Sequence, residues 1–236
     1  MKPSRYHRNR QPYNWLVYHN LDKSLEKHSK YYKGILVDLG CGEAPYKEYF
    51  LQYADKYVGV DWSNTLHNFK ADIVSDLNEK IELEDDYADT VVSISTIEHL
   101  REPENFLKEA NRILKQNGYF ILQVPWQWRV HEAPYDFFRY TPYGLTYLFE
   151  KAGFNVLEIN AVGGFFAMMF LKTNYFTLRF IRGPKFLKTI VKTLLIPFWT
   201  INQIAAMILD GIDKEKFKLI EAPGYFVVAQ KEKQCR

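Results

Sequence analysis

Cysteine is scarce in this chain, whose 236 residues include only Cys41 and Cys235. Two cysteines so far apart form neither a disulfide framework nor a zinc-binding pattern, so a disulfide-stapled secreted domain is excluded. A reducing cytosol is the simplest compartment for such a chain. The N-terminus also lacks the apolar segment of a signal peptide, and we therefore expect a cytoplasmic protein.

Excess charge is lacking as well, since the formal net charge is only +3. Without a long basic stripe, we expect no nucleic-acid partner. Basic side chains nevertheless gather near the N-terminus, at Lys2, Arg5, Arg8 and Arg10. We interpret this stretch as a solvated, partly frayed tail, and the alternative is an arm that closes over a substrate.

Short apolar runs recur along the first half of the chain. They occupy residues 35–37, 57–60, 90–95 and 119–124, and the first two end at Asp38 and Asp61. Runs of this kind indicate strands that are buried on both faces of a sheet. A helical pattern at 103–115 separates two of them, and this alternation predicts a parallel sheet. The other expected elements are helices at 13–32 and 141–152 and strands at 156–159 and 225–229.

A glycine loop, Gly40-Cys41-Gly42, follows the first of these strands. Its glycines allow a ligand to approach the backbone closely. Asp61 ends the next strand, where a carboxylate can accept both hydroxyls of a ribose. The loop alone could be a tight turn, and a nicotinamide dinucleotide site is a rival interpretation. The fingerprint of that site has a third small residue, which would fall at position 45. This chain has Pro45 there, which argues against a dinucleotide site.

These segments together resemble the motifs of class I S-adenosylmethionine-dependent methyltransferases. Residues 38–42 resemble the first motif, and Asp61 matches the acidic residue after the second strand. Residues 71–73 match the adenine-flanking segment after the third strand. The resemblance extends through 89–100 and Pro103 to 112–115, 117–118 and 124–125, so it covers about residues 34 to 126.

The resemblance implies a fold and a domain organisation. We expect an α/β protein with a Rossmann-like, seven-stranded, mostly parallel sheet, helices on both faces and a helical insertion before the last strand. Residues 1–33 would form an N-terminal arm and helix. Residues 34–160 and 214–236 would form the methyltransferase core, and 161–213 the apolar insertion.

The resemblance also implies S-adenosylmethionine as cofactor. Gly40 and Gly42 would face its methionine part, Asp61 its ribose, and Asp72 with Ile73 its adenine. Local hydrogen bonding is the alternative for Asp72 and for His99. The full set of expected cofactor residues is Asp38, Gly40, Cys41, Gly42, Asp61, Trp62, Asp72, Ile73, Ser95 and His99.

The loop at 125–140 faces the methyl acceptor, because ligands bind at the carboxyl ends of the strands. We expect His131 to act as the base and Asp136 to orient it or to bind the acceptor. Arg139 would bind an acceptor phosphate or carboxylate, or pair with Glu132. A loop folded back on internal salt bridges is the alternative, and no ligand spacing calls for a metal. The expected substrate residues are Trp126, Trp128, Glu132, Arg139 and Tyr140.

Residues 131–154 resemble a subgroup of these methyltransferases that is associated with bacterial surface-polysaccharide synthesis. The resemblance implies O-methylation of a hydroxyl of a sugar, glycan or glycolipid. Alternatives are N- or C-methylation of another small molecule, a non-catalytic binding protein on the same fold, and an oxidoreductase.

The insertion at 161–213 contains 17 consecutive uncharged positions, from Thr193 to Leu209. A membrane-spanning helix needs about 20 apolar residues, and Pro197 and Asn202 weaken that interpretation. We expect a pair of helices that forms a lid or a dimer face, in a monomer or homodimer. A peripheral membrane contact through a helix lying at the interface is the alternative.

Overall fold

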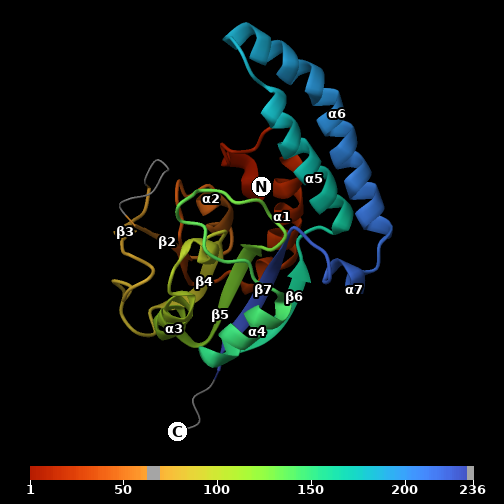
Figure 1. The fold of residues 1–236 in the computed structure, drawn as a ribbon. Helices are drawn as coiled ribbons and strands as arrows, with labels where there is room; N and C mark the ends of the chain where they lie inside the picture. Colours follow the sequence, from red (N-terminus) through yellow and green to blue (C-terminus); the bar gives the residue numbers. More distant parts are fainter. Residues whose placement is uncertain (63–69, 233–236) are drawn as a thin grey trace.

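A single sheet forms the centre of the molecule, seen in a computed structural model that describes residues 1–62 and 70–232 (Figure 1). The strand order is β3-β2-β1-β4-β5-β7-β6. The seven strands of this sheet are β1 (Ile35–Leu39), β2 (Lys56–Asp61), β3 (Ile73–Val74), β4 (Ala88–Ile94), β5 (Leu114–Pro125), β6 (Phe154–Ala161) and β7 (Gly224–Lys231). The predicted seven-stranded α/β fold is confirmed.

The last strand of the chain, β7, inserts between β5 and β6 and runs antiparallel to both. The other pairings are parallel. The six-stranded sheet of dinucleotide-binding domains has the order 3-2-1-4-5-6, without an antiparallel insertion. The topology therefore argues against the oxidoreductase interpretation.

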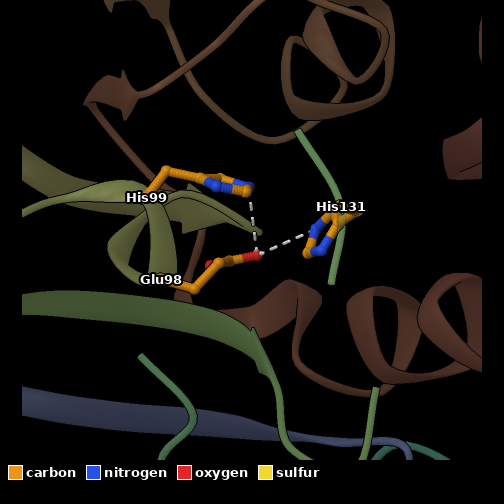
Figure 2. Close-up of side chains that lie close together, drawn as sticks. All are labelled: Glu98, His99 and His131. Atoms are coloured by element: carbon orange, nitrogen blue, oxygen red, sulfur yellow. Dashed lines mark ion pairs between the residues drawn. The ribbon is translucent and has the colours of Figure 1, made fainter. Parts of the chain in front are cut away.

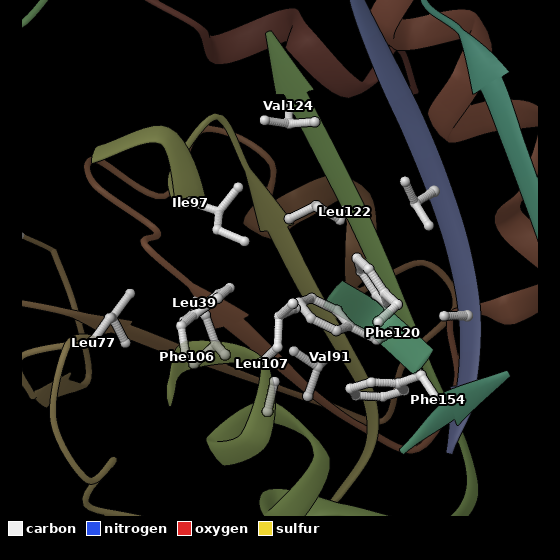
Figure 3. Close-up of a cluster of buried hydrophobic side chains, with 14 of the residues drawn as sticks. Leu39, Leu77, Val91, Ile97, Phe106, Leu107, Phe120, Leu122, Val124 and Phe154 are labelled. Carbon is white, nitrogen blue, oxygen red and sulfur yellow. The ribbon is translucent and has the colours of Figure 1, made fainter. Parts of the chain in front are cut away.

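Two apolar layers cover the sheet, because successive side chains of a strand point to opposite faces. On one face, Phe120 and Leu122 of β5 pack against α3 (Pro103–Ile113) and α4 (Pro142–Lys151) (Figure 3). On the other face, Ile121 packs with α1 (Trp15–Lys27) and α2 (Lys47–Phe50). The expected arrangement of helices on both faces is confirmed.

Several predicted boundaries need correction. The helix expected at 13–32 is α1 followed by a short 3-10 turn, η2 (Ser29–Tyr31). The helix expected at 103–115 ends at Ile113, and Leu114 already belongs to β5. Asn117, with a φ of 62°, lies where the β4–β5 pairing is irregular and does not stop the helix. A second 3-10 turn, η3 (Ile97–His99), follows β4.

The N-terminal stretch is not a frayed tail. It forms a 3-10 turn, η1 (Pro3–Tyr6), that is fastened to α1. The backbone N–H and the hydroxyl of Ser4 both donate to Asp22, over 2.7 Å each, and Arg10 donates to the Ser4 hydroxyl. Arg8 also lies 3.4 Å from the Glu43 carboxylate. This segment therefore fits the alternative interpretation, an arm placed over the site.

The insertion forms a helical hairpin that projects beyond the rest of the molecule (Figure 1). It consists of α5 (Phe165–Thr177), the turn η4 (Leu178–Phe180) and α6 (Lys185–Ile212), and α7 (Glu215–Lys218) leads back to β7. Leu16 of α1 packs with Leu171 of α5 and Ala206 of α6. Among the described residues, α6 is long and apolar enough to cross a membrane by length and composition. Cys41 is buried and free, and Cys235 lies outside the described residues.

Candidate active site

A cavity of about 1250 Å³ lies at the carboxyl ends of β1, β2, β4 and β5. It is large enough for a cofactor together with an acceptor. The structure brings most of the predicted site residues to its wall: Asp38, Gly40, Cys41, Gly42, Asp61, Trp62, Ser95, His99, Trp128, His131 and Glu132. The N-terminal arm adds residues that we did not predict, among them His7, Arg8 and Tyr13.

The glycine loop is shaped for a ligand at one position and for packing at another. Gly42 has a φ of 53°, and a Cβ built on it meets nothing within 4 Å, so its backbone is open to the cavity. Gly40 has a φ of 85°, and a Cβ there would come 2.2 Å from the Thr96 hydroxyl. Gly40 thus permits tight packing against Thr96, and Gly42 lets a ligand approach the backbone. The helix that follows, α2, has only four residues and offers little as an anion site.

Asp61 joins the second strand to the glycine loop. Its carboxylate accepts hydrogen bonds from the backbone N–H groups of Gly42, at 2.6 Å, and Trp62, at 2.8 Å. The residue is only 8% exposed. Trp62 meets Tyr135 of the acceptor loop edge to face, with ring centroids 5.1 Å apart. Two parts of the site that are far apart in sequence therefore touch here.

The predicted adenine residues Asp72 and Ile73 do not line the cavity. The third strand is only two residues long, so Asp72 precedes it and does not follow it. Its carboxylate accepts a hydrogen bond from the backbone N–H of Gly59 over 2.8 Å. The segment that does follow the strand lines the cavity with Asp76, Leu77 and Asn78. Sequence reasoning missed these three because so short a strand leaves no apolar run.

Side-chain hydrogen bonds hold the ends of β1 and β4, a buried one at Asp38 and an exposed one at Ser95. Asp38 accepts a 2.6 Å bond from the Tyr57 hydroxyl, and burial raises the pKa of Asp38 to about 7. Ser95 has a φ of 52°, and its hydroxyl donates to the side-chain oxygen of Gln123. Both residues therefore shape the cavity floor.

A buried carboxylate lies between two histidines at the acceptor side of the cavity (Figure 2). Glu98 Oε1 is 3.6 Å from His99 Nε2 and 3.8 Å from His131 Nε2. The Glu98 side chain is fully buried, and neither oxygen has a hydrogen-bond partner among the described residues. Unpaired buried polar groups are costly, and they concentrate at functional sites. Glu98 was not among our predicted site residues, because its pairing with His131 spans 33 positions.

The environment sets the protonation of this cluster. Burial raises the pKa of Glu98 to about 8, so the carboxyl group holds a proton at neutral pH. Burial, together with the neighbouring His99, lowers the pKa of His131 below its ordinary value. The Nδ1 of His99 faces the Tyr135 carbonyl oxygen and must donate to it. The lowered pKa of His131 favours the neutral form of its imidazole near pH 7.

Asp136 orients His131. Its Oδ2 accepts a 2.8 Å hydrogen bond from the His131 backbone N–H and lies 3.3 Å from the ring Nδ1. Arg139 donates to both oxygens of Asp136, at 2.5 and 2.7 Å. Partial burial raises the pKa of Asp136, but the bonds from Arg139 and His131 outweigh it and lower that pKa to about 2. Asp136 thus stays a carboxylate, and it does not itself line the cavity.

Three predicted substrate residues make structural contacts, and acceptor binding by them stays a prediction. Arg139 donates to Asp136 and to the carbonyl oxygens of Phe138 and Arg129. Tyr140 is buried and donates to the Ile97 carbonyl. Trp126 packs against the core. Near these residues, Arg129 does line the cavity, and its guanidinium lies 4.6 Å from the centre of the Tyr175 ring.

The same cluster has the donor set of a cation site. One ligand atom each from Glu98, His99 and His131 lie within 4.8 Å of one another. Imidazole nitrogens with a carboxylate oxygen suit several divalent metals. We expected no metal from the sequence, and that remains a prediction.

Replacing Glu98 with glutamine should flatten the pH dependence of stability. A pKa of about 8, against an ordinary 4.5, means that the folded state binds the proton more tightly. The contribution of this group to stability is therefore complete below pH 4.5 and is lost as pH rises to 8, by at most about 1.4 kcal/mol per pH unit. Thermal melts of wild type and Glu98→Gln between pH 5 and 9 should diverge in favour of the variant at high pH. Parallel melting curves would contradict the assignment.

Comparisons with known proteins agree with this geometry. Residues 37–122 match the family model described as a methyltransferase domain. A probable S-adenosylmethionine-dependent methyltransferase of Mycolicibacterium smegmatis is 28% identical, over a match covering 51% of this chain and 52% of the relative. The chain thus spans about half the length of the curated relative it matches.

Solved structures share the fold. An S-adenosylmethionine-dependent methyltransferase of Mesorhizobium loti superposes with a TM-score of 0.57 at 13% identity, over 89% of this chain and 97% of that one. The cyclase SpnF superposes with a TM-score of 0.59 at 14% identity, over 91% of this chain and 81% of that one. Because a cyclase shares the fold, fold likeness alone does not settle the reaction.

Residues 37–122 thus match a methyltransferase domain, on a fold shared with solved S-adenosylmethionine-dependent methyltransferases. The matched domain and the relative imply S-adenosylmethionine as the cofactor. The residues present fit that molecule. Gly42 leaves its backbone open, and the buried carboxylate of Asp61 ends β2, with Trp62 beside it.

Proposed function

We propose that this chain transfers a methyl group from S-adenosylmethionine to a hydroxyl of a sugar, glycan or glycolipid. The observation that carries the proposal is the cluster of Glu98, His99 and His131. Its histidines line the same cavity as the glycine loop, so a base and the cofactor residues share one space. A non-catalytic binding protein would have no use for a buried carboxyl group that lacks a hydrogen-bond partner and lies beside two histidines.

His131 is placed to remove the acceptor proton. When bound, S-adenosylmethionine supplies a methyl group that is already activated, so positioning and proton removal are what the chain must add. His131 Nδ1 lies 3.3 Å from Asp136 Oδ2 and 3.5 Å from Arg139 Nη2. In the tautomer that places Nδ1–H toward the Asp136 carboxylate, Nε2 keeps its lone pair for a proton. In such a transfer the S–CH₃ bond would break as the O–CH₃ bond forms, S-adenosylhomocysteine would leave, and the proton of the acceptor O–H would move to Nε2 and later to solvent. The imidazolium lies between Asp136 and Glu98, whose carboxyl oxygens stabilise it.

The cavity wall beyond the histidines suits a sugar with an anionic group. Trp128, Tyr135, Phe137 and Tyr175 line it, and flat aromatic faces can stack on a pyranose ring. Arg129 lies among them and can pair with a phosphate. Nucleotide sugars and polyprenol-phosphate-linked glycans both have this combination of ring and phosphate.

The alternatives to O-methylation make different demands on the acceptor. An ammonium group must also lose a proton before it is methylated, so the same base would serve it, and only an acceptor screen separates N- from O-methylation. C-methylation would require an acidic carbon in the acceptor.

An acceptor screen tests the proposal. The chain is incubated with S-adenosylmethionine and a panel of nucleotide sugars, polyprenol-phosphate glycans, amines and phenols, and release of S-adenosylhomocysteine is measured. Turnover should depend on a hydroxylated glycan. Turnover with amines alone would overturn O-methylation, and turnover that needs a divalent cation and stops with EDTA would replace the base with a metal at the same cluster.

A further inference from the structure

The long helix α6 buries several polar side chains against the protein and leaves many large apolar side chains exposed. Its buried residues are Trp199, Asn202, Gln203, Ala206 and Asp210. Large apolar side chains are exposed along its whole length: Phe186, Ile190, Leu194, Ile201, Ile208 and Ile212. At about 100° per residue, these six fall within roughly 80° of one side of the helix. This is the reverse of an ordinary surface helix, which buries its apolar stripe.

Hydrogen bonds fix that orientation. Gln203 accepts from the Leu16 backbone N–H at 2.9 Å, and its amide donates to the Pro12 carbonyl at 2.8 Å. Asn202 donates to Asn174 of α5 at 2.8 Å. Rotating α6 to bury its apolar stripe would break these buried bonds, so the stripe is held outward.

Asp210 adds a second anchor. Its carboxylate accepts from the backbone N–H groups of Gly164, Phe166 and Ala167, over 2.9 to 3.0 Å. These N–H groups lie at the N-terminus of α5 and lack partners within that helix. Asp210, near the C-terminus of α6, therefore caps the N-terminus of α5. The two helices are locked as one hairpin.

The projecting half of the hairpin is basic. No acidic residue occurs between positions 159 and 209. Six exposed basic side chains do occur there, at Lys172, Arg179, Arg182, Lys185, Lys188 and Lys192. Within the described residues, none of these six forms a salt bridge with an acidic side chain. Lys185, Lys188 and Lys192 lie on the side of α6 opposite the apolar stripe, at about 100° per residue.

An apolar stripe opposite a lysine-rich face is the pattern of helices that lie in the plane of a membrane surface. We propose that the hairpin of α5 and α6 docks on an anionic lipid bilayer, with the apolar stripe of α6 in the headgroup–acyl boundary and the basic residues attracted by acidic headgroups. A spanning helix does not fit, because Asn202, Gln203 and Asp210 are bound to the folded domain. A second copy of this chain fits the stripe less well, because pairing two hairpins would bring their basic residues together without acidic partners.

Docking would place the methyl-transfer cavity at the membrane. Leu171 and Tyr175 of α5 line that cavity, while the opposite helix of the hairpin carries the stripe. A glycan linked to a membrane polyprenol would then be presented beside the site. The proposal of docking does not depend on methyl transfer, since vesicle binding is measured without cofactor or acceptor.

Vesicle co-sedimentation tests the docking. The full chain is mixed with vesicles of phosphatidylcholine alone, or of phosphatidylcholine with phosphatidylglycerol. We expect binding to the anionic vesicles and at least about tenfold weaker binding to the neutral ones. The stripe variant Leu194→Asp/Ile201→Asp should lose binding, and Lys185→Glu/Lys188→Glu/Lys192→Glu should weaken it at least about tenfold.

Matched variants elsewhere on the surface serve as controls. Lys30→Glu/Lys80→Glu/Lys108→Glu changes charge equally, and Tyr143→Asp/Tyr147→Asp removes exposed aromatics of α4. Both should bind like wild type, and melting temperatures show whether each variant folds. Failure of wild type to bind either vesicle, or equal losses in the control variants, would overturn the proposal. A soluble dimer that the stripe variant dissociates, with no vesicle binding, would assign the stripe to a second copy instead.

Discussion

Replacing His131 with alanine is expected to lower kcat/KM by about 10² to 10⁴, the usual contribution of a positioned general base. S-adenosylmethionine affinity should stay within about twofold, because His131 contacts Glu98, Asp136 and the acceptor side of the cavity. The loss should be in kcat more than in cofactor binding. Steady-state kinetics with an acceptor from the screen, alongside calorimetry, measures both quantities.

The pH profile gives an independent check of the base. Because burial lowers the pKa of His131, wild-type kcat/KM should fall only below pH 6.5. His28→Ala is a useful control, since His28 is a buried histidine that contacts Glu158 on the far side of the sheet and does not line the cavity. Full turnover by His131→Ala, or an unchanged acid limb in that variant, would remove His131 as the base.

Replacing Asp61 with alanine should weaken S-adenosylmethionine binding by about 10- to 100-fold. The carboxylate supplies charge-assisted hydrogen bonds worth about 1.5 to 3 kcal/mol each, and it also holds Gly42 in place. Calorimetry on the wild type and the variant measures the change directly.

Asp72→Ala is the matched control for Asp61. Asp72 has the same side chain as Asp61 and also accepts a backbone hydrogen bond, from the N–H of Gly59, but it does not line the cavity. The Asp72 variant should bind the cofactor within a few-fold of wild type. Equal affinity of wild type and Asp61→Ala would refute the cofactor assignment.

Local patterns in the sequence were enough to predict the sheet. The apolar runs before Asp38 and Asp61 are long enough to signal buried strands, and their acidic ends lie at the edge where ligands bind. The two-residue strand β3 gives no such run, so we expected the cavity wall at Asp72, whereas the residue that lines the cavity is Asp76, four positions later.

Long-range contacts explain most of what the sequence did not reveal. Glu98 approaches His131 only because the acceptor loop folds back on η3, where Phe137 donates to the Glu98 carbonyl. The N-terminal arm looked like a tail because its anchor, Asp22, is on the next helix. By contrast, the Asp136–Arg139 pair spans only three positions, whereas the partner that we considered for Arg139 was Glu132, seven positions away.

The most direct test of methyl transfer is the fate of a labelled methyl group. The chain is incubated with S-adenosylmethionine that carries a CD₃ group and with a polyprenol-phosphate glycan or nucleotide sugar, and the product is fragmented by mass spectrometry. The label should be found on a hydroxyl oxygen of the sugar, and it should be absent from products made with His131→Ala. A label on nitrogen or carbon, or no transfer to any acceptor by a chain that binds the cofactor, would contradict O-methylation.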